Sequence, residues 1–250
     1  MTTDLTGRVA LVTGGGRGIG LEVAAKLSRL GLTVVIGARE PAGAAQRASR
    51  ARVAGDGAVH TVRLDVTDPE SLMAVAGWVG DHLGGLDVLV NNAGIAGDRE
   101  AQVAGQASTE VVRDVFATNV FGVIAVTETM LPLIRRSRHG RIVNVSSSVG
   151  SLTRMSDPHH YFADLPGSLA YPASKSALNQ ITVQYAKQLK KAGILVNAAD
   201  PGPCATDFTV GIPGVNRTAA AGAVIIVDLA TLPDDGPTGT LQRDTGVVPW

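Results

Sequence analysis

A tyrosine and a lysine four residues apart are the side chains in this sequence best suited to proton transfer. Tyr171 and Lys175 begin and end the segment YPASK, which opens a stretch of helical character at 170–191. A spacing of four places both side chains on one face of a helix. A free phenol has a pKa of about 10, and a nearby cation lowers it. We therefore predict that Lys175 makes Tyr171 a usable acid and base, although a packed aromatic beside a surface lysine would show the same two residues.

A glycine-rich turn near the start of the chain is the second chemical feature. The segment TGGGRGIG at 13–20 follows an expected strand and precedes an expected helix. Glycines let the backbone approach a pyrophosphate closely, and the free N–H groups of a helix start favour an anion. Such a turn alone is also an ordinary strand-to-helix loop, but its position between strand and helix favours dinucleotide binding.

The end of the second expected strand bears on which dinucleotide binds. A protein that prefers NAD usually has an acid there, about 20 residues beyond the glycine-rich turn, to bind the ribose 2′-hydroxyl. In this chain the segment is GAR at 37–39, and the first acid is Glu40. Arg39 and Arg17 would instead fork around a 2′-phosphate, which an acid would repel. The sequence predicts NADP(H) as the preferred cofactor, with NAD(H) as the alternative.

Short β-branched runs alternate with longer amphipathic segments along the whole chain. The expected strands are 8–13, 32–37, 58–64, 86–91, 140–146, 194–199 and a short one at 238–242, and the expected helices are 18–30, 41–53, 69–83, 108–136, 170–191 and 217–231. Strands this short and apolar are typical of sheets covered on both faces. We predict an α/β fold of the Rossmann type: a doubly wound sheet of about seven parallel strands with helices on both faces, in a single domain over 1–250.

The two least regular segments of the chain should border the substrate. They lie at about 151–169 and at 203–216, and each follows an expected strand. Ligands of open parallel sheets bind beyond the carboxyl ends of the strands. We therefore expect these segments to form the substrate pocket.

Composition and charge exclude several classes of partner. Twenty-two Lys and Arg balance 22 Asp and Glu without a long basic run, so nucleic acid is not an expected partner. We find no signal segment and no run of about 18 apolar residues, and so expect no membrane partner. The single cysteine, Cys204, excludes an internal disulfide and suits the reducing cytoplasm. His159 and His160 lack further ligands at metal-site spacing, so we predict no metal.

Together these motifs resemble the short-chain dehydrogenase/reductase family, in order along nearly the whole chain. Besides the glycine-rich turn and YPASK, the matching segments are Asp65 in LDV, NNAG at 91–94, Asn119 in ATNVFG, IVNVSSS at 142–148, and Pro201-Gly202 through Thr206. The resemblance implies that Tyr171 donates a proton to the substrate oxygen. It implies that Lys175 lowers the pKa of that phenol and holds the nicotinamide ribose.

The resemblance also assigns roles to other residues. Ser147 would polarise the carbonyl where negative charge develops, and Asn119 would hold a water that links Lys175 to solvent. Asp65 and Val66 would border the adenine, and Thr206 would bond to the nicotinamide carboxamide. The implied cofactor-binding residues are Gly14, Gly16, Arg17, Gly18, Ile19, Gly20, Arg39, Asp65, Val66, Asn92, Ala93, Gly94, Tyr171, Lys175, Pro201, Gly202 and Thr206.

Three consecutive serines complicate the choice of the carbonyl-binding hydroxyl. The register of the family motif favours Ser147, and on a persisting strand Ser146 and Ser148 would both point away from it. Ser147 and Tyr171 are 24 residues apart, about twice the commonest family spacing. The extra segment resembles the insertion of the carbonyl reductase subgroup, as do GAR at 37–39, GRG at 16–18 and the final GPTGTLQRDTGVVPW.

The leading prediction is NADPH-dependent reduction of a ketone or aldehyde to an alcohol. An NAD(P)+-dependent alcohol dehydrogenase of a biosynthetic pathway would use the same residues in the opposite direction. A non-catalytic dinucleotide-binding scaffold would carry a damaged tyrosine or lysine, and both are intact here. The long helices at 108–136 and 170–191 resemble those that form family dimers and tetramers, so both a monomer and a homo-oligomer are compatible with the sequence.

Overall fold

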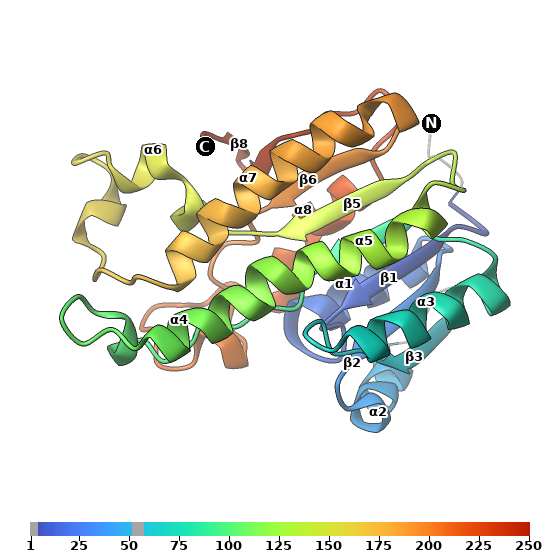
Figure 1. Cartoon of the computed structure of the whole chain (residues 1–250), viewed down its shortest axis with the longest axis horizontal. Coiled ribbons are helices and arrows are strands. Elements are labelled where there is room, and N and C mark those ends of the chain that lie inside the picture. Colours follow the sequence, from blue (N-terminus) through green and yellow to red (C-terminus); the bar gives the residue numbers. More distant parts are fainter. Residues whose placement is uncertain (1–4, 52–57) are drawn as a thin grey trace.

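The strands of the chain form one sheet, seen in the computed structural model, which describes residues 5–51 and 58–250 (Figure 1). The sheet order is β3-β2-β1-β4-β5-β6-β7-β8. The bounds are β1 Val9–Thr13, β2 Thr33–Ala38, β3 Val59–Arg63, β4 Val88–Asn91, β5 Arg141–Val145, β6 Leu195–Ala199, β7 Leu241–Arg243 and β8 Gly246–Val248. Strands β1 to β7 are parallel, and β8 pairs with β7 in the antiparallel direction. The predicted doubly wound sheet with about seven parallel strands is confirmed.

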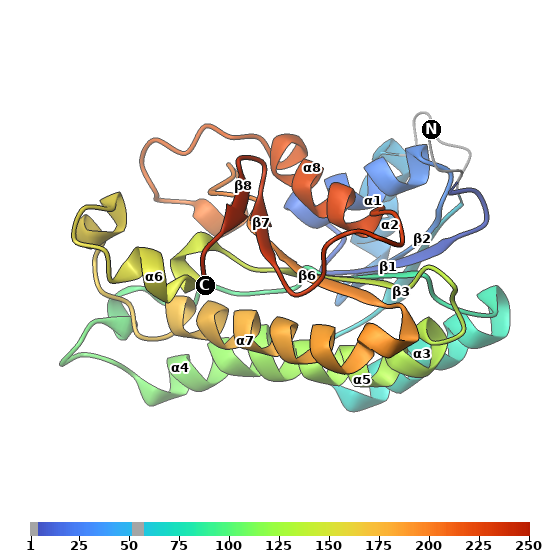
Figure 2. The same cartoon turned by 90° about the horizontal axis from the view of Figure 1, so that it is seen from above.

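Helices cover both faces of this sheet (Figure 2). On one face lie α1 and α8, with α2 beside α1, and on the other lie α3, α5 and α7. Their bounds are α1 Gly18–Arg29, α2 Pro41–Ala51, α3 Pro69–Leu83, α4 Thr109–Phe116, α5 Gly122–Ile134, α6 Leu152–Met155, α7 Tyr171–Leu189 and α8 Ala219–Ala230. Two main apolar cores, one on each side of the sheet, consist mostly of Ala, Val, Leu and Ile. Because both faces are covered, β1, β4 and β6 are buried along their whole length.

Local signals set the ends of several elements. Asp68 precedes α3, and its side chain accepts hydrogen bonds from the backbone N–H groups of Glu70 and Ser71, which have no partner within the helix. Pro69 occupies the first turn, and Gly84, with φ 77°, ends the helix in the left-handed conformation. These signals place the predicted helix 69–83 at its observed bounds.

Successive strands are added to one side of β1 as far as β3, and from β4 onward they are added to the other side. This change of direction between β1 and β4 positions the site. β1 pairs with β2 on one side and with β4 on the other. Crossover connections therefore leave this point in opposite directions, and in open sheets of this kind such a reversal gives a ligand-binding crevice beyond the carboxyl ends of the two strands. The glycine-rich turn follows β1, and the NNAG segment begins at the last residue of β4.

Two predicted elements differ from the structure. The last strand is Leu241–Arg243 rather than 238–242, and the final hairpin adds β8, which was not predicted. The helix predicted at 108–136 is interrupted by a π-helical turn at Ala117–Phe121. Apolar residues continue through that turn, so their pattern alone predicts one uninterrupted helix.

The helical run Thr109–Ile134 is long and apolar enough to cross a membrane by length and composition alone. More than half of its apolar window is buried inside the structure. The run packs against α3, α7 and β4, so its apolar character is that of a core helix.

Candidate active site

Tyr171 and Lys175 lie one helical turn apart at the start of α7. Lys175 is 5% exposed, and its Nζ donates a 2.8 Å hydrogen bond to the carbonyl oxygen of Val145 at the end of β5. The same nitrogen lies 5.6 Å from the centroid of the Tyr171 ring. The helix start and the strand end thus hold a phenol and an ammonium side by side.

Burial controls the protonation of this pair in the protein alone. It lowers the pKa of Lys175 to about 8, against the charge of Asp200, which acts to raise it. Burial raises the pKa of Tyr171, as does the charge of Asp200, whereas a hydrogen bond with Ser147 lowers it. The net shift of the Tyr171 pKa is therefore upward, because removal from water outweighs the hydrogen bond that lowers it. Tyr171 is a neutral phenol near pH 7, able to donate a proton.

A buried glutamine, which the sequence analysis missed, fixes the start of α7. Residue Ala170 provides no side-chain cap, and instead Oε1 of Gln102 accepts the backbone N–H of Tyr171 at 3.0 Å. The Gln102 amide also donates to the carbonyl oxygens of Ala96 and Asp98, each at 2.8 Å. Gln102 therefore ties the loop after β4 to the helix that carries the phenol. Burial is the only feature that distinguishes Gln102 from other glutamines, and burial cannot be read from the sequence.

The three serines after β5 differ in what their hydroxyls contact. Ser146 is buried and donates to Oδ1 of Asn179 at 2.6 Å, and Ser148 is buried and donates to Asp200. Ser147 is half-buried, and its hydroxyl is the one that interacts with Tyr171. This arrangement leaves Ser147 as the serine available to a substrate oxygen beside the phenol.

Asn119 lies within the π-helical turn and is fully buried. Its side-chain amide bonds to both backbone groups of Ile95, accepting from the N–H and donating to the carbonyl, each at 2.9 Å. It also donates to Oγ of Ser174 at 3.0 Å. A Cβ on Gly94 would lie 3.2 Å from Oδ1 of Asn119 and 3.8 Å from Nζ of Lys175, so glycine keeps this junction open. Asn119 thus joins the loop after β4 to α7.

The glycine-rich turn is fastened to the NNAG segment across the crevice. Oγ1 of Thr13 accepts the backbone N–H groups of Asn92 and Ala93, both at 3.0 Å. The Asn92 side chain donates to the carbonyl oxygens of Thr13 and Gly14 at 2.9 and 3.2 Å. These bonds join the carboxyl ends of β1 and β4 at the point of chain reversal.

The same turn has the features of a cradle for a pyrophosphate. Gly14 and Gly18 have φ angles of 61° and 54°, which side-chain-bearing residues rarely adopt. A Cβ on Gly20 would lie 2.5 Å from Nδ2 of Asn92 and 2.7 Å from the carbonyl oxygen of Gly14, so no larger residue fits. Helix α1 begins here without a side-chain cap, which leaves its first N–H groups to an anion. These residues fit a nicotinamide dinucleotide.

Three arginines surround this turn, and one of them was not predicted. Arg17 pairs with Asp207 through Nη1 and Oδ2 at 2.8 Å, with both side chains exposed. Arg39 is exposed at the end of β2, where its charge helps to lower the pKa of Asp65. The arginine that sequence reasoning missed is Arg47 on α2, whose Nε donates to the carbonyl oxygen of Gly16 at 2.6 Å. No motif marks it, because it contacts the turn from the next helix.

The remaining cofactor candidates, Asp65, Val66 and Ile19, differ in their surroundings. Asp65 accepts the backbone N–H and the hydroxyl of Thr67, and these bonds help hold its pKa below the usual range. Val66 is buried against α5, where a Cβ on Gly122 would lie 2.8 Å from its Cγ2. Ile19 packs on the core beneath the turn.

The loop after β6 reaches back over the glycine-rich turn. Gly202, with φ 68°, follows Pro201 and turns the chain toward Thr206. A Cβ on Gly18 would lie 3.4 Å from Cγ2 of Thr206, and the Arg17–Asp207 ion pair lies at the same contact. Thr206 thereby lies beside the start of α1, at the entrance to the crevice.

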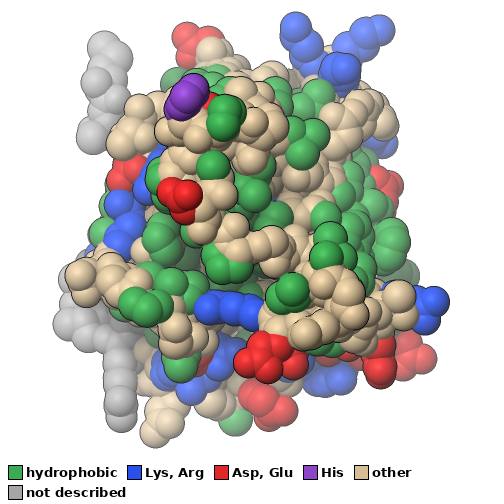
Figure 3. Space-filling view, turned by 90° about the vertical axis from the view of Figure 1, so that its left-hand side faces the viewer, with side chains coloured by type: hydrophobic (Ala, Val, Ile, Leu, Met, Phe, Trp, Pro, Cys, Tyr) green, Lys and Arg blue, Asp and Glu red, His purple; other side chains and the backbone are tan. Residues whose placement is uncertain are grey.

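The two irregular segments gather at one end of the molecule, which Figure 3 views directly. Hydrophobic side chains cover much of this end. The ring of Phe208 lies 5.5 Å from that of Tyr171, and Val210 is 76% exposed. Leu152 and Leu169 of the insertion are also exposed. The end beside the phenol therefore carries several exposed hydrophobic side chains.

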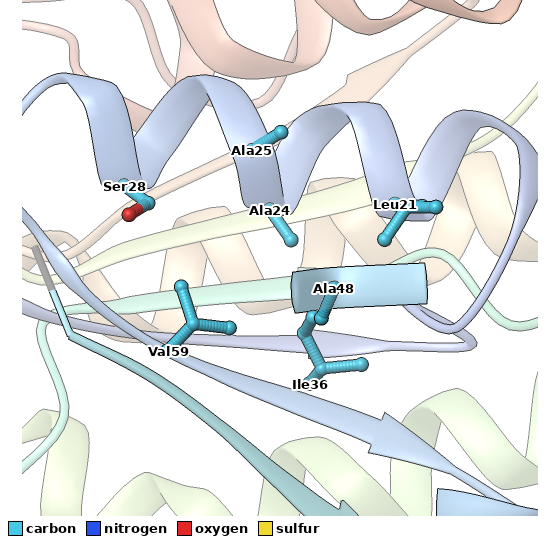
Figure 4. Close-up of a pocket in the computed structure, with 7 residues that line it drawn as sticks. All are labelled: Leu21, Ala24, Ala25, Ser28, Ile36, Ala48 and Val59. Carbon is cyan, nitrogen blue, oxygen red and sulfur yellow. The ribbon is translucent and has the colours of Figure 1, made fainter. Parts of the chain in front are cut away.

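The cavity drawn in Figure 4 is separate from this end. It lies between α1, α2 and the strands beneath them, and its lining is aliphatic apart from Ser28. It contains none of the candidate catalytic side chains.

Among the described residues, no three His, Cys, Asp or Glu side chains gather as metal ligands.

Comparison with known proteins agrees with this geometry. The profile described as short chain dehydrogenase matches residues 8–213. Salutaridine reductase of Papaver bracteatum is 33% identical, with 93% of each chain covered. The 3-oxoacyl-[acyl-carrier-protein] reductase FabG of Vibrio cholerae is also 33% identical, over 88% of this chain and 83% of its own. In the Pseudomonas aeruginosa RhlG/NADP active-site complex, the protein is 29% identical, with a TM-score of 0.82 and 96% of each chain covered.

Proposed function

Because the chain belongs to the short chain dehydrogenase family, we propose that it is an NADP(H)-dependent carbonyl reductase that converts a ketone or aldehyde into an alcohol. One observation carries this proposal: Tyr171, Lys175 and Ser147 converge beside the crevice between β1 and β4. A scaffold that only binds a dinucleotide has no need of a phenol, an ammonium and a hydroxyl held together in this way.

In this proposal Tyr171 donates the proton, and Ser147 orients the substrate. The phenol is neutral near pH 7, and its hydroxyl faces that of Ser147. Both hydroxyls point at the place where charge develops on the carbonyl oxygen, and hydrogen bonds there stabilise the transition state. Lys175, anchored on Val145, supplies a positive charge beside the phenol as it loses its proton. Asn119 and Gln102 hold the helix start in place.

The cofactor supplies the hydride when it is bound. In the proposed arrangement Gly14, Gly18 and the start of α1 hold the pyrophosphate. Arg39 and Arg47 flank the side of the turn that lies toward β2 and α2, and we assign the 2′-phosphate to them. Arg17 joins them only when its exposed pair with Asp207 opens, which costs about 1 kcal/mol or less.

We assign the substrate pocket to the insertion at 151–169 and the loop at 203–216. Phe208 contacts the Tyr171 ring, and exposed hydrophobic side chains lie on the surrounding end of the molecule, among polar and charged ones. A substrate there has an uncharged, hydrophobic body around its carbonyl group.

The buried free thiol of Cys204 suits a reducing compartment, and on that ground we place the protein in the cytoplasm.

The proposal is tested by mixing the purified protein with NADPH or NADH and a panel of hydrophobic ketones and aldehydes. The readout is loss of absorbance of the reduced nicotinamide. We expect turnover of at least one carbonyl compound, with a higher kcat/KM for NADPH than for NADH. Preference for NADH would contradict the cofactor assignment. Tight NADPH binding without turnover of any carbonyl compound would contradict the reductase assignment.

A further inference from the structure

A buried acid, Asp200, lies at the end of β6 and has no part in the proposed chemistry. The residue is 3% exposed. One carboxylate oxygen, Oδ1, accepts the backbone N–H of Gly202 at 2.9 Å. The other, Oδ2, accepts the hydroxyl of Ser148. An acid this buried is costly unless charged or polar groups compensate it, so its neighbours are informative.

Through Ser148, this acid is bonded to the turn that carries the candidate catalytic serine. Ser148 directly follows Ser147 and begins the 3-10 turn Ser148–Gly150. The carbonyl oxygen of Gly150 accepts hydrogen bonds from Oγ of Ser176 at 3.0 Å and Nδ2 of Asn179 at 3.1 Å, both on α7. A Cβ on Gly150 would lie 2.6 Å from the backbone of Lys175. The serine turn therefore lies in contact with α7, one turn beyond the phenol.

The positive charges near Asp200 are not in tight contact with it. Nη1 of Arg243 lies 4.0 Å from Oδ2, and its Nε lies 3.5 Å from the competing carboxylate of Asp244. Nη1 of Arg154, from the insertion, donates to Oγ of Ser148 at 3.2 Å rather than to the acid. The charged or titratable side chains that face Asp200 or its hydrogen-bond partners are Arg154 on α6, Tyr171 and Lys175 on α7, Cys204 and Arg217 after β6, and Arg243 on β7.

We infer that Asp200 is an electrostatic positioning residue, which holds the serine turn through Ser148 and imposes a negative charge on the Tyr171–Lys175 pair. This inference rests on the proposed function, because it concerns the same proton donor. It assigns to Asp200 no contact with substrate or cofactor. The acid acts through the turn it bonds and through the charge it carries.

The sign of the effect follows from the charge. A negative charge nearby disfavours a phenolate and favours an ammonium, so Asp200 raises the pKa of Tyr171 and also that of Lys175. Burial pushes the lysine in the opposite direction. Asp200 thus adds to the effect of burial on the phenol, and it helps to keep the buried lysine charged near pH 7.

The test is a pH titration of Lys175 in Asp200→Asn, observed by lysine-selective NMR on protein without cofactor. Asparagine can accept from Gly202 and donate to Ser148, so it preserves the geometry while removing the charge. In the wild type we expect a pKa of about 8 for Lys175. In the variant we expect this pKa to fall by ~1 unit, as loss of a favourable charge at short range predicts. An unchanged titration would overturn the inference.

Three further variants separate charge from structure. Ser148→Ala breaks the hydrogen bond but keeps the charge, so the titration of Lys175 should stay within ~0.3 units of the wild type. Asp200→Glu keeps the negative charge, so the pKa of Lys175 should again stay close to that of the wild type. Asp200→Ser removes the same charge with a smaller side chain, and should also lower the pKa of Lys175. If Asp200→Asn does not fold, the titration of Lys175 in Asp200→Ser decides, and an unchanged pKa there contradicts the inference.

Activity measurements distinguish a failure of the proposed function from a failure of the inference about Asp200. In the direction of alcohol oxidation, the rise in kcat with pH should begin about one pH unit lower in Asp200→Asn than in the wild type. Loss of kcat at every pH without this displacement indicates a purely structural role and also overturns the inference. If the wild type turns over no substrate, the NMR titration still decides the role of Asp200.

Discussion

The ammonium nitrogen of Lys175 lies 5.6 Å from the centre of the Tyr171 ring and donates its hydrogen bond to the backbone of β5 instead. The lysine therefore acts on the phenol across space, without a direct bond to it. Both groups are withdrawn from water, and for both this withdrawal determines the direction of the pKa shift. The structure thus holds a buried charge at a cost in stability, for which the proposed proton transfer supplies a functional reason.

We predict that Lys175→Met stabilises the fold at neutral pH while it abolishes activity. The pKa of Lys175 falls from 10.5 to about 8 on folding, so the folded state binds fewer protons between these values. Wild-type stability therefore rises as pH increases through this window, and the full penalty, of order 3 kcal/mol, applies below it. Urea denaturation should show the advantage of the variant shrinking by roughly half between about pH 6.5 and pH 9.5.

Lys187→Met is the matched control for that experiment. Lys187 lies on the same helix but is exposed. Its replacement should change the free energy of unfolding by a similar small amount at both pH values. An advantage of Lys175→Met that does not depend on pH would show that the buried ammonium carries no penalty.

Arg47→Gln should weaken the binding of NADPH and leave that of NADH nearly unchanged. The guanidinium is anchored on Gly16 beside the expected position of the 2′-phosphate. Loss of one charge-assisted hydrogen bond of about 1.5 kcal/mol corresponds to a roughly tenfold rise in the Kd for NADPH. Calorimetric titration with each cofactor measures this directly.

Arg29→Gln serves as its control, because Arg29 is exposed in the last turn of α1, away from the glycine-rich turn. It should alter neither Kd. If Arg47→Gln weakens the binding of NADPH and NADH equally, Arg47 maintains the shape of the turn and does not bind the 2′-phosphate.

Gly20→Ala should disrupt the dinucleotide site. The added methyl group would lie 2.5 Å from Asn92 and 2.7 Å from a backbone oxygen, so the turn must shift. We expect a loss of ~1–3 kcal/mol in the free energy of unfolding and at least a tenfold loss in cofactor affinity. Chemical denaturation and fluorescence titration with NADPH measure the two effects.

Gly77→Ala provides the comparison, because Gly77 is exposed within α3 and a Cβ there meets no atom within 4 Å. That change should stabilise the protein by ~0.5–1 kcal/mol and leave cofactor binding intact. If both variants bind NADPH like the wild type, the close packing at Gly20 has no role in binding.

The fold was predictable because local patterns and global topology agree in this chain. Buried runs such as RVALVT and an Asp-Pro helix start identify strands and helices directly, and their alternation fixes a parallel sheet. The β8 hairpin was missed because its three residues, Gly246–Val248, are too short to show a period. The π-helical turn was missed because apolar residues continue through it, and the bonds of Asn119 to Ile95 within it join distant residues that the pattern does not report.

The candidate site was predictable only for residues whose spacing along the chain brings their side chains together. The four-residue interval from Tyr171 to Lys175 implies a shared helix face, and the structure has it. Gln102, Arg47 and Asp200 lie in no motif, and each reaches the site from another element of the fold. The direction of the phenol's pKa shift also escaped sequence reasoning, because it depends on burial.

Tyr171→Phe tests the central claim most directly, because it removes one hydroxyl and retains the ring that packs on Phe208. Steady-state oxidation of NADPH with a carbonyl substrate should lose at least ~100-fold in kcat, the usual contribution of a general acid. The Kd for NADPH should stay close to that of the wild type. Wild-type kcat in this variant would contradict the account.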